Sequence, residues 1–244
     1  MLRTPIAAAL ILGALISGTA LKSKDEAPPA PIQMFNPADP AFAPVADVPG
    51  LPRVLLLGDS ISIGYTPLVR ERLKGRANVH RPVDNCRQVA YGIEHLDAWL
   101  GSGHWDVIHF NFGLHDMKYL DPQGRYVTPD KGTQVAPPGQ YEANLRRLVA
   151  RLRKTGARLV FATTTPVPEG AEGRVKGDEA RYNQIALAVM REAGVDIDDL
   201  GALAARDQAR IQLPHNVHFT PEGYRELAAA AADSIAAELR KASQ

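Results

Sequence analysis

Two polar stretches of the chain carry the residue types that serine-based catalysis needs. Ser60 ends the stretch Gly58-Asp59-Ser60, directly after the apolar run of residues 54–57, and His218 lies just ahead of the last helical pattern. A serine hydroxyl is a weak nucleophile until a neighbouring base takes its proton, and histidine is the side chain most often used for this. These stretches therefore predict a serine nucleophile and a histidine general base, if the fold brings them together.

The elements around these residues predict a fold that does so. Four aliphatic residues followed by a polar turn are typical of a strand buried on both faces of a parallel sheet. Further strand patterns cover residues 78–81, 105–112, 158–164 and 194–197. Helical patterns cover residues 65–74, 92–100, 141–154, 178–192, 199–211 and 221–240. This alternation predicts an α/β fold with a parallel sheet of about five strands, which binds its ligands at the carboxyl edge where Ser60 lies.

Three short blocks, in this order, resemble those of the SGNH (GDSL-type) hydrolase family. Gly58-Asp59-Ser60 resembles the block with the nucleophile, residues 113–116 (Gly-Leu-His-Asp) stand where the family has Gly-x-Asn-Asp, and residues 218–224 resemble the block with the general base. The resemblance covers the chain from about residue 53 to the C-terminus. It implies a flavodoxin-like three-layer α/β/α sandwich, the SGNH hydrolase fold, and ester hydrolysis without a cofactor or a metal.

The resemblance also implies an oxyanion hole. Its donors would be the backbone N–H of Ser60, a main-chain N–H near Arg87 and the side chain of His115, which replaces the family's asparagine. A neutral imidazole N–H can still donate to an oxyanion. Gly113 and Asp116 are expected to support this loop, and Asp59 to bind backbone N–H groups of the turn before Ser60 rather than substrate.

The group that orients His218 is left open by the sequence. The family often has an aspartate three residues before the histidine, and here that position is His215. The site could be a Ser60–His218 dyad, or a backbone carbonyl or another acid could hold the ring. A zinc site built from His115, His215 and His218 is the alternative. It is disfavoured because the loop lacks helical presentation and Ser60 would have no role.

The N-terminal part of the chain has the pattern of an exported protein. Residues 1–20 combine Arg3, an apolar run over residues 5–16 and small residues that include Gly18 and Ala20, which predicts a signal peptide. An uncleaved anchor is the alternative, although the apolar run is short for a membrane span. Residues 21–50 read as a proline-rich linker and residues 51–244 as one hydrolase domain. The expected location is therefore extracellular or periplasmic, with no stable membrane insertion after signal removal.

Composition narrows the function further. The formal charge of +1 and the aromatic content of 6% offer little to a nucleic acid, so nucleic-acid binding is not expected. Cys86 is the only cysteine, so an intramolecular disulfide is excluded. A lone cysteine is more often a small buried apolar residue than a reactive one. His109, inside a strand pattern, is expected to be a core histidine. The proline- and glycine-rich residues 113–140 are either a functional loop or a disordered insertion.

These observations together predict an exported serine esterase. The expected substrates are small-molecule or glycan esters, with O-acetyl groups of carbohydrates first among them. The alternatives are a lipase or lysophospholipase-type esterase, an acyltransferase that uses the same nucleophile, and a catalytically weak glycan-binding protein of the same fold. The binding alternative is motivated by the absent aspartate at His215 and the absent asparagine at His115.

Overall fold

A computed structural model describes Met1 and residues 36–242 of this chain. The predicted signal peptide and the first half of the predicted linker lie outside the described residues. In chain order the elements are η1 (Pro40–Phe42), β1 (Arg53–Leu57), α1 (Ser60–Arg72), β2 (Asn78–His80), α2 (Val89–Leu100), β3 (Val107–Phe110), β4 (Tyr119–Leu120), β5 (Thr133–Gln134), α3 (Pro138–Leu152), η2 (Arg153–Thr155), β6 (Arg158–Ala162), α4 (Asp178–Ala193), β7 (Asp196–Asp198), α5 (Leu200–Arg206), α6 (Gln208–Ile211) and α7 (Pro221–Ala242).

The central sheet has five strands in the order β2-β1-β3-β6-β7, and every neighbouring pair is parallel. The predicted α/β class and the number of strands are thereby confirmed. The chain leaves β1 first towards β2 and then returns to the other side of β1 with β3. In open α/β sheets ligands bind at such a reversal, outside the carboxyl ends of the two strands. The fold therefore points to the ends of β1 and β3 as the place for a site.

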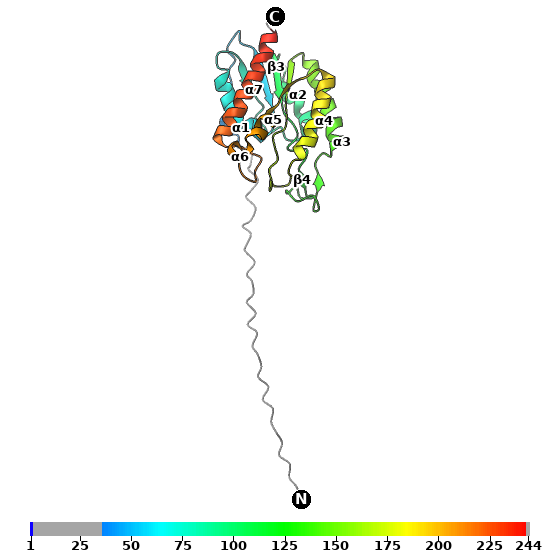
Figure 1. Cartoon of the computed structure of the whole chain (residues 1–244). Coiled ribbons are helices and arrows are strands. Elements are labelled where there is room, and N and C mark those ends of the chain that lie inside the picture. The colour runs from blue at the N-terminus through cyan, green and yellow to red at the C-terminus, as the bar shows by residue number, and fades with distance from the viewer. Residues whose placement is uncertain (2–35, 243–244) are drawn as a thin grey trace. The chain divides into compact units, whose positions relative to one another are not determined.

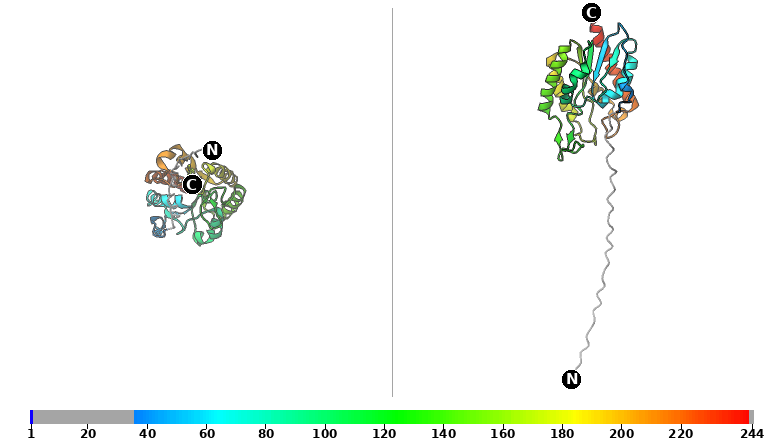
Figure 2. Two further views of the ribbon diagram at one scale, coloured as in Figure 1. Left: turned by 90° about the horizontal axis from the view of Figure 1, so that it is seen from below. Right: turned by 180° about the vertical axis from the view of Figure 1, so that it is seen from behind.

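Helices cover both faces of this sheet. Helices α1 and α7 pack together on one face with α5 and α6, and α2, α3 and α4 pack in sequence on the other (Figures 1 and 2). The inner strands consist of buried side chains because helices cover them on both sides: β3 is buried at all four positions, and β1 at four of its five. The arrangement is the three-layer α/β/α sandwich that the sequence predicted.

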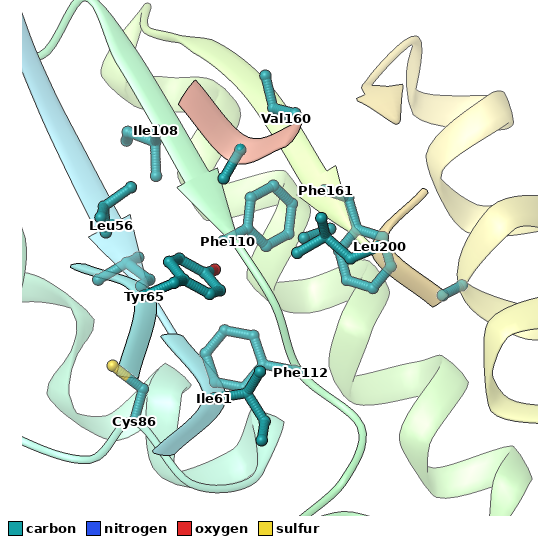
Figure 3. Packing of buried hydrophobic residues seen from close by; sticks show 14 of the residues in the cluster. Leu56, Ile61, Tyr65, Cys86, Ile108, Phe110, Phe112, Val160, Phe161 and Leu200 are labelled. Atoms are coloured by element: carbon teal, nitrogen blue, oxygen red, sulfur yellow. The ribbon is translucent and has the colours of Figure 1, made fainter. Parts of the chain in front are cut away.

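The core between these layers is aromatic and aliphatic (Figure 3). Phe110 of β3 and Phe161 of β6 pair in register and pack edge to face, with ring centroids 5.4 Å apart. Fully burying a side chain of this kind contributes about 1.5–3 kcal/mol. His109 is fully buried, with Nε2 2.8 Å from Asp198 Oδ2, so it is a core histidine. Cys86 is also fully buried, and burial raises the pKa of its thiol to about 12.

Part of the predicted linker packs against the domain. Residues 36–50 include η1, in which Ala41 and Phe42 are buried. The side chain of Asn78 on β2 accepts from the Val48 N–H at 2.9 Å and donates to the carbonyls of Val48 and Leu51. The proline content of this segment excludes long helices and strands but leaves side chains able to pack. The folded unit therefore includes residues that the composition alone assigned to the linker.

The segment of residues 113–140 is folded rather than an irregular insertion. It contains the antiparallel hairpin of β4 and β5. Tyr182 of α4 donates its hydroxyl to the Ala136 carbonyl at 2.7 Å, and Tyr141 of α3 donates to the Phe112 carbonyl at 2.9 Å. The buried Tyr182 thus fastens the segment to α4, and the buried Tyr141 ties the residue just before the segment to α3. Within residues 36–242, no helix is both long and apolar enough to cross a bilayer.

Candidate active site

Ser60 lies at the first position of α1, directly after the end of β1. Asp59 caps this helix by accepting from the Ile61 N–H at 2.9 Å, and its carboxylate is almost completely buried, which raises its pKa. The Ser60 N–H has no acceptor among the described residues, as expected for the first turn of a helix. An unpaired N–H at a helix N-terminus is a favourable place for a developing negative charge. The local structure of the turn thus presents both a hydroxyl and an anion-binding donor.

His218 is in direct contact with that hydroxyl. Its Nε2 lies 2.8 Å from Ser60 Oγ, in a loop between α6 and α7. The loop is closed by a bridge between Gln212 and Phe219, and the Gln212 amide donates to the Val217 carbonyl at 3.1 Å. Burial, together with the nearby Arg174, lowers the pKa of His218, so the imidazole is neutral at pH 7 and able to accept a proton.

Asn216 supplies the orienting contact that the sequence left open. Its Oδ1 lies 2.7 Å from His218 Nδ1 and 3.0 Å from the His218 backbone nitrogen. A backbone N–H can only donate, so the Asn216 atom that faces it must be the oxygen. Nδ1 therefore carries the imidazole proton, and the Nε2 lone pair faces Ser60. The signal for this residue was present in the sequence, because asparagine often binds backbone groups two residues further on.

His215 takes no part in this arrangement. Its backbone is left-handed, with φ of 55°, and its Nδ1 lies 2.8 Å from the Glu169 carbonyl oxygen, to which it donates. The residue at the family's aspartate position is thereby turned onto a neighbouring loop and does not contact His218. In the part of the chain that the structure describes, no three His, Cys, Asp or Glu side chains are grouped to hold a metal ion.

His115 is placed as a neutral hydrogen-bond donor. Lys118 Nζ lies 3.1 Å from His115 Nδ1, and because an ammonium group only donates, Nδ1 must be the acceptor. The proton of the neutral ring is then on Nε2. Burial, followed by the charges of Lys118, Arg174 and Arg87 and the neighbouring His218, lowers the pKa of His115 well below its usual value. His115 follows β3, which pairs in parallel with β1, so it lies at the same carboxyl edge of the sheet as Ser60.

The turn that carries His115 is tightly fixed. A Cβ on Gly113 would lie 2.2 Å from Thr164 Oγ1, and the Gly113 backbone has φ of +157°, so only glycine fits there. Asp116 accepts from the Val89 N–H at the start of α2, at 3.1 Å to one oxygen and 3.3 Å to the other. This contact joins the His115 turn to the segment that contains Arg87.

Arg87 stands where the family usually has glycine, and its backbone N–H already forms a hydrogen bond. The residue is left-handed, with φ of 53°, and its N–H donates to Asn85 Oδ1 at 3.0 Å. That N–H reaches an oxyanion only after the bond to Asn85 is exchanged. The other two predicted oxyanion donors are the Ser60 N–H and the Nε2–H of His115. Neither of them donates to another group among the described residues.

The parallel sheet of five strands, with a serine after β1 and a histidine before the last helix, defines the chain as an SGNH hydrolase in fold. It belongs to the GDSL-like lipase/acylhydrolase family, whose model matches residues 56–226, more than half of the chain. A comparison with curated proteins gave no match.

Solved structures of similar fold include esterases and an acylhydrolase. The acetyl xylan esterase AlAXEase superposes with a TM-score of 0.61 at 17% identity, over 75% of this chain and 99% of that one. The lipase/acylhydrolase from Enterococcus faecalis gives a TM-score of 0.62 at 17% identity, over 78% and 97%. The acetylxylan esterase Axe2 from Geobacillus stearothermophilus gives 0.59 at 17%, over 75% and 94%. At these identities the likeness is one of fold.

Proposed function

We propose that this protein is an exported serine esterase that hydrolyses small-acyl esters of carbohydrates. The observation that carries the proposal is the contact of 2.8 Å between Ser60 Oγ and His218 Nε2, at the carboxyl edge of the sheet. Membership of a lipase/acylhydrolase family supports ester chemistry. Two of the similar structures are acetylxylan esterases, which makes O-acetylated sugars the first substrates to test.

In the first half of the reaction Ser60 becomes acylated. His218 Nε2 takes the hydroxyl proton while Oγ bonds to the ester carbonyl carbon, and the carbonyl π electrons move onto its oxygen. The Asn216 oxygen holds the other ring nitrogen, so the imidazolium keeps its orientation. The imidazolium then gives its Nε2 proton to the alcohol oxygen as the bond between that oxygen and the carbon breaks.

The second half repeats these steps with water. His218 takes a proton from water as the water oxygen attacks the acyl carbon, and the proton returns to Ser60 Oγ when the acid leaves. In both halves the oxyanion is bound by the Ser60 N–H and the Nε2–H of His115, whose tautomer Lys118 sets. Removal of one oxyanion donor typically lowers the rate by about 100- to 1,000-fold.

The proposal is tested by hydrolysis of p-nitrophenyl acetate by residues 36–244, beside Ser60→Ala and His218→Ala. We expect turnover by the wild type and a loss of at least about 1,000-fold in either variant, because the two residues act as a unit. Equal turnover by all three folded proteins would contradict the proposal.

Export is tested separately by N-terminal sequencing of the protein from its producing cells. We expect a chain that starts at Leu21, and a start at Met1 would argue against cleavage.

A further inference from the structure

Three cationic side chains surround the candidate active site without a carboxylate partner. Lys118 contacts the His115 ring, Arg174 donates to the carbonyl of the preceding Leu114, and Arg87 lies two residues before the Val89 N–H that Asp116 binds. All three lower the pKa of His115. Among residues 36–242 none of them forms an ion pair, whereas other arginines such as Arg146 and Arg210 each bind two or more carboxylates.

Lys118 and Arg174 are held in place by neutral groups. Lys118 Nζ contacts His115 Nδ1 at 3.1 Å, and Arg174 donates from Nε to the Leu114 carbonyl at 2.8 Å and from Nη1 to the Glu172 carbonyl at 3.2 Å. Both cations also lie against the ring of Tyr126, at 5.1 Å and 5.7 Å from its centroid. These contacts fix the direction of both cations, and none of them is made with a carboxylate.

Arg87 adds a third positive charge at the exposed rim of the site. Its guanidinium lies 4.6 Å from the centroid of the Tyr91 ring, on the segment that precedes α2. The side chain is exposed, unlike those of Lys118 and Arg174. The cations therefore come from three separate segments of the chain and meet at one place.

The nearby carboxyl groups form no ion pair with these cations, although the charge of Asp59 raises the pKa of Arg174 and of Lys118. Asp59 and Asp116 both accept from backbone N–H groups and contact none of the three cations. Burial raises the pKa of both, that of Asp116 to about 8, so Asp116 is mostly uncharged at pH 7. Burial lowers the pKa of Lys118 to about 8, which still leaves it mostly charged. A partly buried cation without a counterion is costly to keep, and an incoming anion would remove that cost.

We propose that the site accepts an ester that carries its own negative charge, with the anion bound by Arg174 and Lys118 and with Arg87 at the rim. The expected class is an O-acylated acidic carbohydrate, in which a carboxylate of the sugar lies a few bonds from the ester. This inference rests on the proposed esterase function, because it concerns the same site. A carboxylate on the acyl group could bind the same cations. The experiment below therefore distinguishes a carboxylate on the sugar from one on the acyl group.

The test uses two pairs of esters that differ only in one charge. The first pair is O-acetylated methyl galacturonoside as the free acid and as the amide, and the second is p-nitrophenyl succinate and p-nitrophenyl succinamate. We expect at least about a 10-fold higher kcat/KM for the acid of the first pair, the factor that one charge-assisted hydrogen bond supplies. A higher kcat/KM for the acid in the second pair alone would show that the bound anion belongs to the acyl group. That result would overturn the acidic-sugar assignment.

Substitutions assign the preference to particular residues. Lys118→Gln and Arg174→Gln should each lower the acid-to-amide ratio towards one, whereas Arg174→Lys should retain part of it. Lys131→Gln, an exposed position on the same folded segment, serves as the matched control and should leave the ratio unchanged. If the glutamine variants slow both members of a pair equally, the cations stabilise the oxyanion instead and the proposal is overturned.

A binding measurement separates this inference from the proposed function. Calorimetry with Ser60→Ala compares the acidic sugar ester with its amide and does not depend on turnover. Tighter binding of the acid by Ser60→Ala, together with a wild type that hydrolyses no ester, would support the anion site and reject the esterase. Equal binding of both by Ser60→Ala, together with a wild type that hydrolyses p-nitrophenyl acetate through Ser60, would reject the anion site alone.

Discussion

At the scale of single residues, His218 is held at both ring nitrogens, by Ser60 at one and by Asn216 at the other. An asparagine oxygen fixes the tautomer as well as a carboxylate does, because it accepts the same proton. It stabilises the imidazolium less, since it carries no full charge. Burial and Arg174 already lower the pKa of His218. The imidazole of His218 is therefore well oriented to accept a proton, and its lowered pKa makes it a weak base.

Asn216 is expected to affect kcat by orienting the His218 ring, and not by contacting the substrate. Asn216→Ala removes the acceptor of the Nδ1 proton, and we expect kcat to fall by at least about 10-fold, towards the roughly 10,000-fold seen where an orienting residue holds the wrong tautomer. KM for p-nitrophenyl acetate should change little. His215→Asn is the matched control, because asparagine tolerates the left-handed backbone at that position. A loss in the control as large as that in Asn216→Ala would contradict this role.

The pH profile provides a readout that a purely structural role would not move. Activity needs neutral His218, and its lowered pKa puts the acid limb of kcat/KM below pH 6.5. Asn216→Asp keeps an acceptor and adds a negative charge, which stabilises the imidazolium, so the limb should shift to higher pH while turnover at pH 8 is retained. An unchanged limb in a folded, active Asn216→Asp protein would argue against the contact.

At the scale of elements, the packing of α1 on α7 sets the distance between nucleophile and base. Ser60 starts α1, and His218 lies three residues before α7 begins at Pro221. Gly64 allows the two helices to approach closely, because a Cβ there would lie 2.2 Å from the ring of Tyr224. The helix pair thus positions Ser60 and the loop that carries His218, and Gly64 permits its close spacing.

Gly64→Ala should therefore damage both stability and activity. Overpacking of this kind typically costs about 1–3 kcal/mol, and any shift of α7 moves His218 away from Ser60. Gly139→Ala in α3 is the control, because its Cβ meets nothing within 4 Å and alanine is the better helix former. Urea unfolding and p-nitrophenyl acetate kinetics measure the two effects. A Gly64→Ala protein as stable and active as Gly139→Ala would show that the close approach is dispensable.

Much of this architecture was predictable from the sequence because local pattern and tertiary role agree. Residues 54–57 and 159–162 are aliphatic or aromatic runs typical of a strand covered on both faces, and Ser60 and His218 lie in blocks of recognisable order. The boundaries were less exact: α1 begins at Ser60 rather than at residue 65, since Asp59 caps it, and the helix expected over residues 199–211 breaks at Asp207.

The missed features depend on contacts between distant segments. Packing of Phe42 and the role of Asn78 involve partners about thirty residues away or more, which no local pattern encodes. Asn216 is not predicted by the family pattern, because the family's aspartate stands at position 215, where this chain has His215. The hairpin of β4 and β5 has strands of two residues each, too short to show an alternation.

At the scale of the whole molecule, burial of Asp116 links stability to pH. Its pKa is about 8 in the folded chain, above its ordinary value of 3.8, because burial penalises the charged form. Between these two pH values the folded chain holds one more proton than the unfolded chain at this group. Its contribution to stability is therefore fully present below pH 3.8 and is lost as pH rises towards 8, by up to about 1.4 kcal/mol per pH unit.

Asp116→Asn should remove this dependence. The amide oxygen can still accept from the Val89 N–H, and no charge is buried at any pH. We expect the variant to gain stability relative to the wild type from pH 5 to pH 8, that is, the difference in the free energy of unfolding (variant minus wild type) should increase. Other titrations cancel in this difference. Urea unfolding at both pH values measures this. A variant whose relative stability falls over that range would contradict a raised pKa.

The central claim for the molecule is that Ser60 is an activated nucleophile at the carboxyl edge of the sheet. Covalent labelling with a fluorophosphonate, followed by peptide mass spectrometry, tests it most directly because it needs no knowledge of the substrate. We predict one adduct per chain on Ser60, absent in Ser60→Ala and formed at least about 100-fold more slowly in His218→Ala. A folded wild-type protein that stays unlabelled, or that is labelled equally fast without His218, would contradict the claim.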